Sequence, residues 1–145
     1  MIREDSEQAG IVTRPESVVW YERLAWAAIG FGLASTAADP ATFAKYLSRY
    51  PIVYPIIFVC AIVGQLFWIW LIARRRQNWA CWTSLVSIII GTPGVILDIN
   101  ARFRLNPNAA IAFHLGYLLL VGAVALLFRR DAREWFARTR LASGT

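Results

Sequence analysis

Five polar or ionisable side chains lie within or at the ends of long apolar stretches of this sequence: Gln65, Ser84, Ser87, Asp98 and His114. An ionisable group is costly in an apolar environment, so it is a functional candidate whose partner should be named. For His114, the only histidine, we name Asp98, with Arg102 and Arg104 nearby. This pair could relay protons or respond to pH, or His114 could be a structural residue near an interface. The five residues form the predicted polar intramembrane cluster.

Gln65 is predicted to face the stretch that contains the two serines. Eight residues separate Gln65 from Ala73 at the end of its stretch, and eight separate Ser87 from Trp79. At 1.5 Å per residue, both side chains lie at a depth of about 12 Å. Gln65 could therefore hydrogen-bond to Ser84 or Ser87. A polar contact with another subunit or with a substrate is the alternative.

Small and polar residues recur at intervals of four and three between positions 80 and 98, which places them on one helix face: Ala80, Ser84, Ser87, Gly91, Gly94 and Asp98. Small faces let helices approach closely, and serines add hydrogen bonds between helices. The functional alternative is a face that lines a cavity or pore. Pro93, beside Gly94, predicts a kink because proline removes a backbone donor.

No known catalytic motif accompanies these residues. The sequence lacks a phosphate-binding GxxxxGK loop, an HExxH zinc motif and a GxSxG nucleophile motif. Cys60 and Cys81 are far apart and form no CxxC pair, which favours buried thiols over a redox or zinc site. We therefore predict no catalytic residue, cofactor or metal, and a lipid- or quinone-linked enzyme is the weakest interpretation.

The elements that must position these residues are membrane-spanning helices. Hydrophobic residues make up 58% of the 145 residues and charged residues 17%, against about 45–50% and about 25% in soluble domains. Four apolar stretches, at 18–37, 52–73, 79–99 and 109–128, reach the roughly 20 residues that a spanning helix needs. We predict an all-α, four-transmembrane-helix bundle that forms a single integral membrane domain over 1–145. The charged segment 1–17 lacks the pattern of a cleavable signal peptide.

Arginine positions predict the orientation of the bundle. The N-terminal region, the 74–78 turn and the 129–145 tail carry eleven arginines, whereas the opposite side carries Lys45, Arg49, Arg102 and Arg104. Because basic residues accumulate on the cytoplasmic side, both termini are expected in the cytoplasm. The arginine-rich composition favours a bacterial inner membrane. The net charge of +6 thus reflects topology, and we predict no nucleic-acid partner.

Two amphipathic segments flank the predicted spans. Asp39-Pro40 has the pattern of an N-cap followed by proline at the first helical position, and a short helix over 40–49 is expected on the outer membrane surface. In the tail, apolar residues at 128, 132, 135 and 136 share a face. The tail therefore either prolongs the last span or bends onto the inner leaflet, where anionic lipid would bind its arginines. Thr13 to Glu16 matches a capping box, with Thr13 as N-cap.

Small and aromatic residues complete the predicted framework. Ala28, Gly32 and Gly116, together with Gly91, Pro93 and Gly94, are predicted to form close helix contacts, which could close the bundle or join copies into an oligomer. The predicted interface anchors are tryptophans and arginines near the ends of the spans: Trp68, Trp79, Trp82, Trp135, Arg74, Arg75, Arg76, Arg129 and Arg130.

Two segments carry a resemblance. Residues 14–24, RPESVVWYERL, and 127–136, LFRRDAREWF, together with four spans, resemble those of small, uncharacterised four-helix inner-membrane proteins of proteobacteria. The resemblance implies the plan of the fold and no activity. The sequence lacks the CxxC of four-helix thiol–quinone reductases. Glu22 lies too near the end of its span to match the membrane-embedded glutamate of small multidrug exporters.

We therefore expect a non-enzymatic membrane protein that binds a protein partner, membrane lipid or copies of itself through helix packing. The alternative is a small oligomeric channel or transporter whose path is lined by the small face at 80–98 with Gln65 and His114. The two functions differ in the surroundings of this face. If it packs against neighbouring helices without water, the binding function is favoured. If it lines a hydrated cavity, the transport function is favoured.

Overall fold

The computed structural model describes residues 14–75 and 77–142, and in these ranges every regular element is an α-helix. The helices are α1 (Glu16–Ala38), α2 (Pro40–Arg49), α3 (Val53–Ala73), α4 (Asn78–Leu105), α5 (Pro107–Leu126) and α6 (Arg130–Ala142). Three of them, α3, α4 and α5, are long and apolar enough to cross a membrane. The predicted all-α class is confirmed, and these three helices are those expected of a multi-pass membrane protein.

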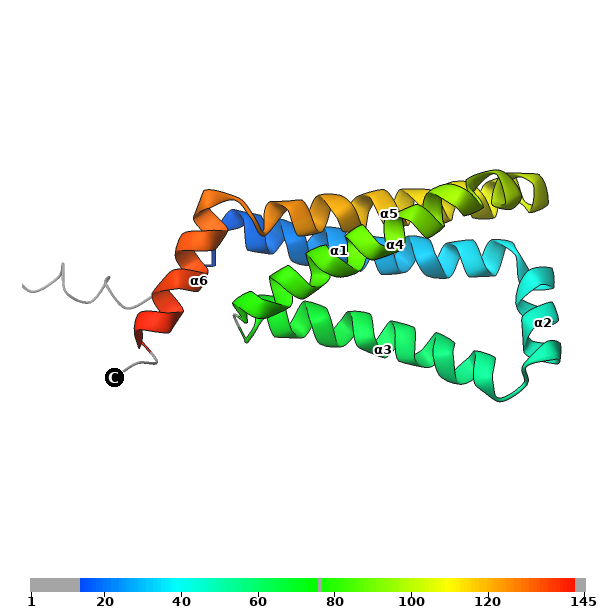
Figure 1. Cartoon of the computed structure of the whole chain (residues 1–145), viewed down its shortest axis with the longest axis horizontal. Helices are drawn as coiled ribbons and strands as arrows, with labels where there is room; N and C mark the ends of the chain where they lie inside the picture. Colours follow the sequence, from blue (N-terminus) through cyan, green and yellow to red (C-terminus); the bar gives the residue numbers. More distant parts are fainter. Residues whose placement is uncertain (1–13, 76, 143–145) are drawn as a thin grey trace, which may run out of the picture.

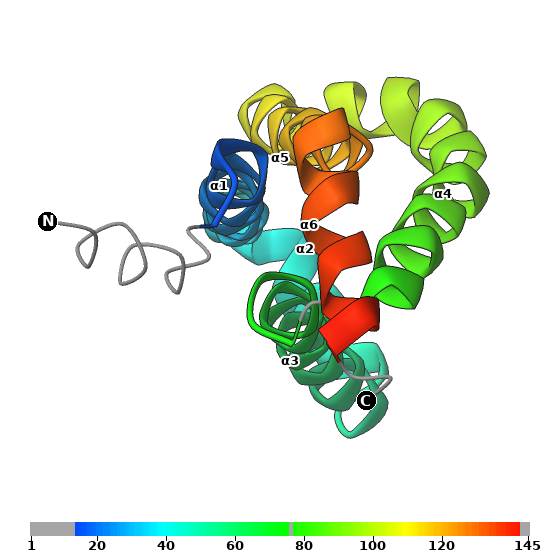
Figure 2. The ribbon, with the colours of Figure 1, turned by 90° about the vertical axis from the view of Figure 1, so that its left-hand side faces the viewer.

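The helices α1 and α5 form a tight pair, whereas α3 and α4 form a loose pair. α1 and α5 lie side by side and make the most extensive contact between helices (Figures 1 and 2). α3 diverges from α1 towards α2, which bridges the two helices at that end (Figure 1). α4 follows a curved course from the side of α3 to the side of α5 (Figure 2). α6 lies across the opposite end, where α1 begins.

The buried core is concentrated at the α6 end of the bundle. Its members come from the start of α1, the end of α3, the start of α4, the end of α5 and the buried face of α6: Val18, Tyr21, Ala25, Ile69, Leu71, Ile72, Ala80, Cys81, Ala123, Val124, Leu127, Ala132, Trp135 and Phe136. Since consecutive long helices run in opposite directions, these segments meet at one end. The first two-thirds of α3 contribute no residue to this core.

Local signals account for the start of α2. The Asp39 carboxylate accepts a hydrogen bond from the Thr42 backbone N–H at 3.1 Å, and Pro40 occupies the first helical position. This arrangement satisfies a backbone donor that a helix start leaves without an intrahelical partner. The predicted helix over 40–49 is therefore confirmed with the same bounds.

The boundary between α4 and α5 differs from the prediction. A loop was expected between residues 99 and 109, but α4 continues to Leu105 and α5 begins at Pro107. Asn106 both ends α4 and caps α5, because its side-chain oxygen accepts a hydrogen bond from the Ala109 N–H at 3.2 Å. Arg102 and Arg104 lie in the last turn of α4, where positive charge is favourable. The Asn-Pro pair is a cap signal of the same type as Asp39-Pro40.

The predicted capping box at the start of α1 is wrong. α1 begins at Glu16 with Pro15 in the N-cap position and no capping side chain. Thr13 lies outside the described residues. The Glu16 carboxylate instead accepts a hydrogen bond from the Trp20 indole N–H at 3.2 Å.

The tail does not prolong α5. The backbone N–H groups of Leu127, Phe128 and Arg129 each donate to the carbonyl three residues earlier, a tightened turn that often ends an α-helix. α6 then turns across the bundle and buries Ala132 and Trp135 in the core. The predicted bend therefore occurs.

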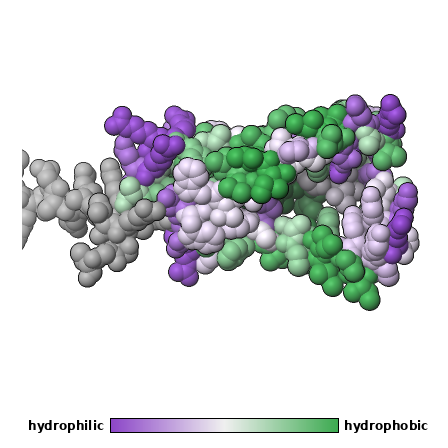
Figure 3. All heavy atoms as spheres, viewed as in Figure 1, coloured by the Kyte–Doolittle hydropathy of each residue, from purple (hydrophilic) through white to green (hydrophobic). Residues whose placement is uncertain are grey.

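Polar and apolar residues are distributed along the bundle as a membrane requires. Figure 3 shows apolar surface over the middle and hydrophilic residues gathered at the two ends. Many exposed residues of α3 and α4 are large and apolar, among them Ile57, Ile90 and Leu97. An exposed apolar surface of this kind suits contact with lipid.

Candidate functional site

The predicted polar cluster is divided between two cavities on one face of α4. Ser84 and Ser87 line an inner cavity of about 160 Å³ with Gln65. Asp98 lines an outer cavity of about 360 Å³ near α2. His114 lines neither of these cavities. The structure thus brings Gln65 near the two serines and separates them from the two ionisable residues.

Gln65 forms no hydrogen bond with either serine within the described chain, although all three line the inner cavity. The Ser84 hydroxyl donates instead to the Ala80 carbonyl at 2.9 Å. A helical serine readily bonds to the carbonyl one turn earlier, which removes the need for a partner on α3. Gln65 lines this cavity together with Tyr21 and Tyr117.

A polar contact missing from the sequence predictions joins α4 to α5 beside this cavity. The Thr92 hydroxyl donates to the Ile88 carbonyl at 2.7 Å and lies 2.6 Å from the Tyr117 hydroxyl. Tyr117 also lies 3.2 Å from the Ile88 carbonyl. These bonds sit directly before Pro93, which lacks a backbone N–H. The helix continues through Pro93, and the hydroxyl groups supply polar contacts in this part of the span.

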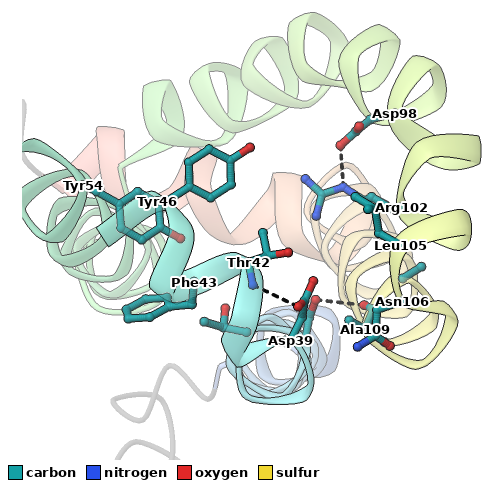
Figure 4. Close-up of a pocket in the computed structure, with 13 residues that line it drawn as sticks. Asp39, Thr42, Phe43, Tyr46, Tyr54, Asp98, Arg102, Leu105, Asn106 and Ala109 are labelled. Carbon is teal, nitrogen blue, oxygen red and sulfur yellow. Dashed lines mark hydrogen bonds and ion pairs between the residues drawn. The ribbon is translucent and has the colours of Figure 1, made fainter. Parts of the chain in front are cut away.

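Residues of five helices, α1 to α5, line the outer cavity, and they include charged, aromatic and amide groups. Figure 4 shows Tyr46 and Tyr54 on one side and the Asp98–Arg102 pair on the other, with Thr42 between them. The two tyrosine rings stack with centroids 5.5 Å apart. The cavity therefore offers one guanidinium group, carboxylates and aromatic faces to a polar occupant.

Neighbouring side chains fix the wall of the outer cavity. The Ser35 hydroxyl of α1 donates to the Ala109 carbonyl of α5 at 2.8 Å. The Asn106 amide donates to the Ala38 carbonyl at the same distance. Two hydrogen bonds thus join the end of α1 to the start of α5 and hold this side of the cavity.

Asp98 and His114 do not form the predicted pair. Asp98 forms an ion pair with Arg102, one turn further along α4, and the Arg102 guanidinium also lies 4.1 Å from the centroid of the Phe113 ring. An arginine on the same helix face meets the carboxylate more readily than a histidine on another helix. The proposed His–Asp relay is therefore wrong.

His114 has a mainly aromatic environment. Its Nδ1 atom lies 2.7 Å from the Ala110 carbonyl, so Nδ1–H donates to this carbonyl oxygen. Nε2 is buried and has no hydrogen-bond partner in the described part of the chain. The ring stacks on Phe103 with centroids 5.7 Å apart and meets the edge of Phe113. These contacts favour the structural interpretation of His114.

The small face of α4 is open between the two cavities. Gly91 and Gly94 lie between Ser87 and Asp98 on this face, and a Cβ atom placed on either glycine would have no neighbour within 4 Å. No helix of the described chain therefore packs closely against the middle of the face. The predicted dry packing of Gly91 and Gly94 is not found within one chain.

The other predicted small-residue contact does form. A Cβ atom on Gly116 would lie 3.1 Å from the Ala28 carbonyl oxygen and 3.1 Å from the Phe31 Cβ. The Gly32 nitrogen would be 3.5 Å away. Gly116 thus lets α5 approach the backbone of α1, and these three predicted packing residues meet.

The predicted interface anchors have different environments. Trp79 and Trp82 are exposed, and Trp68 meets the edge of Trp79 with ring centroids 5.6 Å apart. Trp135 lies in the core beside Phe136 instead of on the surface. Arg76 lies outside the described residues.

The described arginine anchors are held by carboxylates or by an aromatic ring. Arg74 lies 3.7 Å from the Glu22 carboxylate, which also binds Arg14 at 2.8 Å. Arg75 lies over the Trp70 ring at 4.9 Å. The other two anchors pair within α6 and its preceding turn: Arg129 with Asp131 and Arg130 with Glu134.

Candidate metal ligands and related proteins give no further information about the function of this site. Among the described residues, no three His, Cys, Asp or Glu side chains gather in a way that could hold a metal ion. Comparison with protein-family models, with curated proteins and with solved structures finds no match for the chain. The two cavities and the open face between them are therefore the features of this chain that bear on its function.

Proposed function

We propose that this chain is a four-helix protein of the bacterial inner membrane, with both termini in the cytoplasm. We further propose that it binds a membrane lipid along α4 and catalyses no reaction. The lipid proposal is based on one observation, which is that the middle of the α4 face is open. Gly91 and Gly94 leave space that no helix of the described chain fills, and a cavity lies towards each end of this face.

The proposed fourth crossing is α1. It has 23 residues and lies beside α5 along the bundle (Figure 2), so the two helices reach the same two ends. Glu22 and Arg23 lie in its first turns. Ionisable side chains near a helix end can extend to the interface, and Glu22 is neutralised by Arg14 and Arg74.

Charge supports the proposed orientation. The start of α1, the α3–α4 turn and α6 share one end of the bundle (Figure 1), and most of the arginines belong to these segments. Lys45, Arg49, Arg102 and Arg104 belong to the opposite end. The arginine-rich end is therefore placed in the cytoplasm by the positive-inside rule.

The proposed lipid has its alkyl chain in the open face and its headgroup in the outer cavity. An alkyl chain gains contact with the apolar walls of α3 and α4 without requiring hydrogen bonds. A phosphate could bind Arg102, whose Nε atom is used by Asp98 but whose two terminal nitrogens extend beyond it. The Tyr46 and Tyr54 rings suit the membrane interface.

Filling the open face tests this proposal. In the double variant Gly91→Leu/Gly94→Leu, native mass spectrometry after mild delipidation should find the occupancy of one bound phospholipid per chain lowered at least about ten-fold relative to wild type, a difference of about 1.4 kcal/mol. Gly30→Leu is the matched control, because Gly30 on α1 also has open space around a Cβ position. Equal lipid retention in all three proteins would contradict the proposal. So would a stable dimer that dissociates in the double variant, since a second copy would then cover the face.

A small oligomeric channel or transporter is the second candidate. It is favoured by one observation, that the two cavities lie on the same face of α4 towards opposite ends of the bundle. In this case wild-type protein in proteoliposomes would conduct ions or solutes, and Gly91→Leu/Gly94→Leu would block the flux. Proteoliposomes that conduct neither ions nor solutes, together with lipid that stays bound to the wild-type protein, would favour the lipid-binding function.

A further inference from the structure

A separate pocket lies at the α6 end of the molecule, between the start of α4 and α6. It has a volume of about 600 Å³. Its walls are largely apolar and aromatic, and they include Cys81, Trp82, Phe128 and Phe136. Asn78, the first residue of α4, lies at the same pocket. Because α6 crosses the end of the bundle there (Figure 2), this pocket is distinct from the two cavities along α4.

Arg133 is the one charged residue among those that line this pocket in the described chain. The neighbouring arginines are engaged elsewhere, since Arg129 pairs with Asp131 at 4.0 Å and Arg130 pairs with Glu134 at 2.9 Å. Arg133 has no carboxylate at ion-pairing distance within the described residues. Its guanidinium lies over the Phe128 ring, 5.9 Å from the centroid, which places its charge beside an apolar wall.

The start of α4 adds positive potential at the same place. α4 begins at Asn78, and its N-cap residue Gln77 provides no side-chain hydrogen bond to the first turn. The free N–H groups at a helix start carry partial positive charge and favour anions. A guanidinium and a helix start therefore act together at a pocket whose described lining contains no carboxylate.

The surroundings of the pocket suit a lipid better than a soluble anion. Trp82 is exposed and joins the pocket to the apolar surface of α4, and its ring packs edge-on against Phe128 at 5.2 Å. Exposed tryptophans of this kind lie at the headgroup level of a bilayer. A headgroup at Arg133 would thus have its alkyl chains directed along an apolar, membrane-facing wall.

We propose that the α4–α6 pocket binds the phosphate headgroup of an anionic phospholipid. Arg133 supplies the opposite charge, the start of α4 supplies N–H donors, and Trp82 and Phe128 contact the upper part of the alkyl chains. Basic pockets between membrane helices on the cytoplasmic side bind anionic headgroups in this way. The inference uses the proposed orientation to assign the inner leaflet, and it is independent of the lipid proposed along α4.

Competition between lipids in nanodiscs tests this site with the full-length protein. Wild type extracted from nanodiscs of mixed phosphatidylglycerol and phosphatidylcholine should retain phosphatidylglycerol selectively in native mass spectrometry. Arg133→Gln should lower that retention about five-fold. Ala137→Trp keeps the charge but fills the pocket, since Ala137 lines it, and should cause a similar loss. Both positions are exposed, and circular dichroism checks that each variant is folded.

Arg75→Gln is the matched control for the loss of one positive charge. Arg75 lies at the same end and on an aromatic ring, but it does not line the pocket, so retention should stay at the wild-type level. Equal losses in Arg75→Gln and Arg133→Gln would indicate general surface attraction and overturn the site. Displacement of the lipid by excess inorganic phosphate would also overturn it. Gly91→Leu/Gly94→Leu should leave the phosphatidylglycerol preference unchanged, which separates failure here from failure of the lipid site along α4.

Discussion

The α1–α5 pair and the α3–α4 pair use similar residues with opposite results. Both pairs contain glycines at helical spacing inside apolar segments. At Gly116, a Cβ atom would meet α1 at 3.1 Å, whereas at Gly91 and Gly94 it would meet nothing within 4 Å. Glycines therefore permit close approach without causing it. The second helix must also present a complementary surface at the same depth, as α1 does with Ala28 and Gly32.

The loose pair is also anchored differently. α1 and α5 are joined at the α2 end by hydrogen bonds of Ser35 and Asn106. α3 contributes to the core only through its last turns, among them Ile69 and Ile72. α3 is thus held at the α6 end, while its other end contacts mainly α2, through Phe43 and Tyr54. This difference leaves the face of α4 open.

The sharpest test of the comparison is one substitution placed in each pair. Gly116→Leu should destabilise the fold by about 3 kcal/mol, because the side chain must displace the α1 backbone. Gly91→Leu should be neutral or stabilising by up to about 1 kcal/mol, because it adds helix propensity in open space. Reversible unfolding in mixed micelles measures both. Equal destabilisation would show that the α4 face is packed as tightly as α1–α5.

A second test compares the two ends of α3. Ile72→Ala should cost about 2 kcal/mol or more, since Ile72 is fully buried and its truncation leaves a cavity in the core. Ile57→Ala should change the free energy of unfolding by less than about 0.5 kcal/mol, since Ile57 is 61% exposed. The same unfolding measurement applies. A large loss at Ile57 would mean that α3 is anchored along its whole length.

The smallest expected effect concerns the contact of α6 with α1. Although limited burial of the Asp131 carboxyl acts to raise its pKa, hydrogen bonding from Ser17 and the charge of Arg129 lower that pKa below its usual value. The Ser17 backbone N–H lies 3.4 Å from this carboxylate. A lowered pKa means that Asp131 stabilises the fold above its unfolded pKa of about 3.9. This contribution is lost as the pH falls through the lower, folded value.

Comparison with Asp131→Asn measures this contribution. The variant should be slightly less stable than wild type near neutral pH. The difference should begin to shrink below about pH 3.9 and disappear once the pH is below the folded-state pKa. Glu134→Gln is the control, because the ion pair of Glu134 within the described residues is with the exposed Arg130 one turn away. A stability difference that persists in acid would show that the carboxylate charge is not responsible.

Local patterns in the sequence predicted local structure well. Asp39 followed by Pro40 determined both the start and the cap of α2, because such a cap depends on residues within one turn. The same signal occurs at Asn106, but hydropathy alone ends one apolar stretch at 99 and begins the next at 109, so it predicts a loop where α4 and α5 meet at a single cap residue. The amphipathic pattern around Trp135 allowed either a prolonged last span or a bend, and it indicated neither which of the two occurs nor the burial of that ring.

Contacts between helices were less predictable. Equal estimated depths placed Gln65 near Ser87 correctly but could not show that α3 diverges from α4. His114 was paired with Asp98 because both lie near one membrane surface, whereas Arg102 on the same helix is a closer partner. The Thr92–Tyr117 contact depends on the relative rotation of α4 and α5, which the sequence of either helix does not specify.

The placement of α6 has a consequence for biosynthesis. The core joins Val18, near the beginning of the chain, to Phe136, near its end, and the Ser17–Asp131 contact spans 114 residues. The ribosome synthesises these segments in order, so α1 is made long before its main partner α5. α1 must therefore remain without that partner until α5 has been synthesised. The core is completed only when α6 is present, and a chain that stops before α6 would leave the bundle without one side of its core.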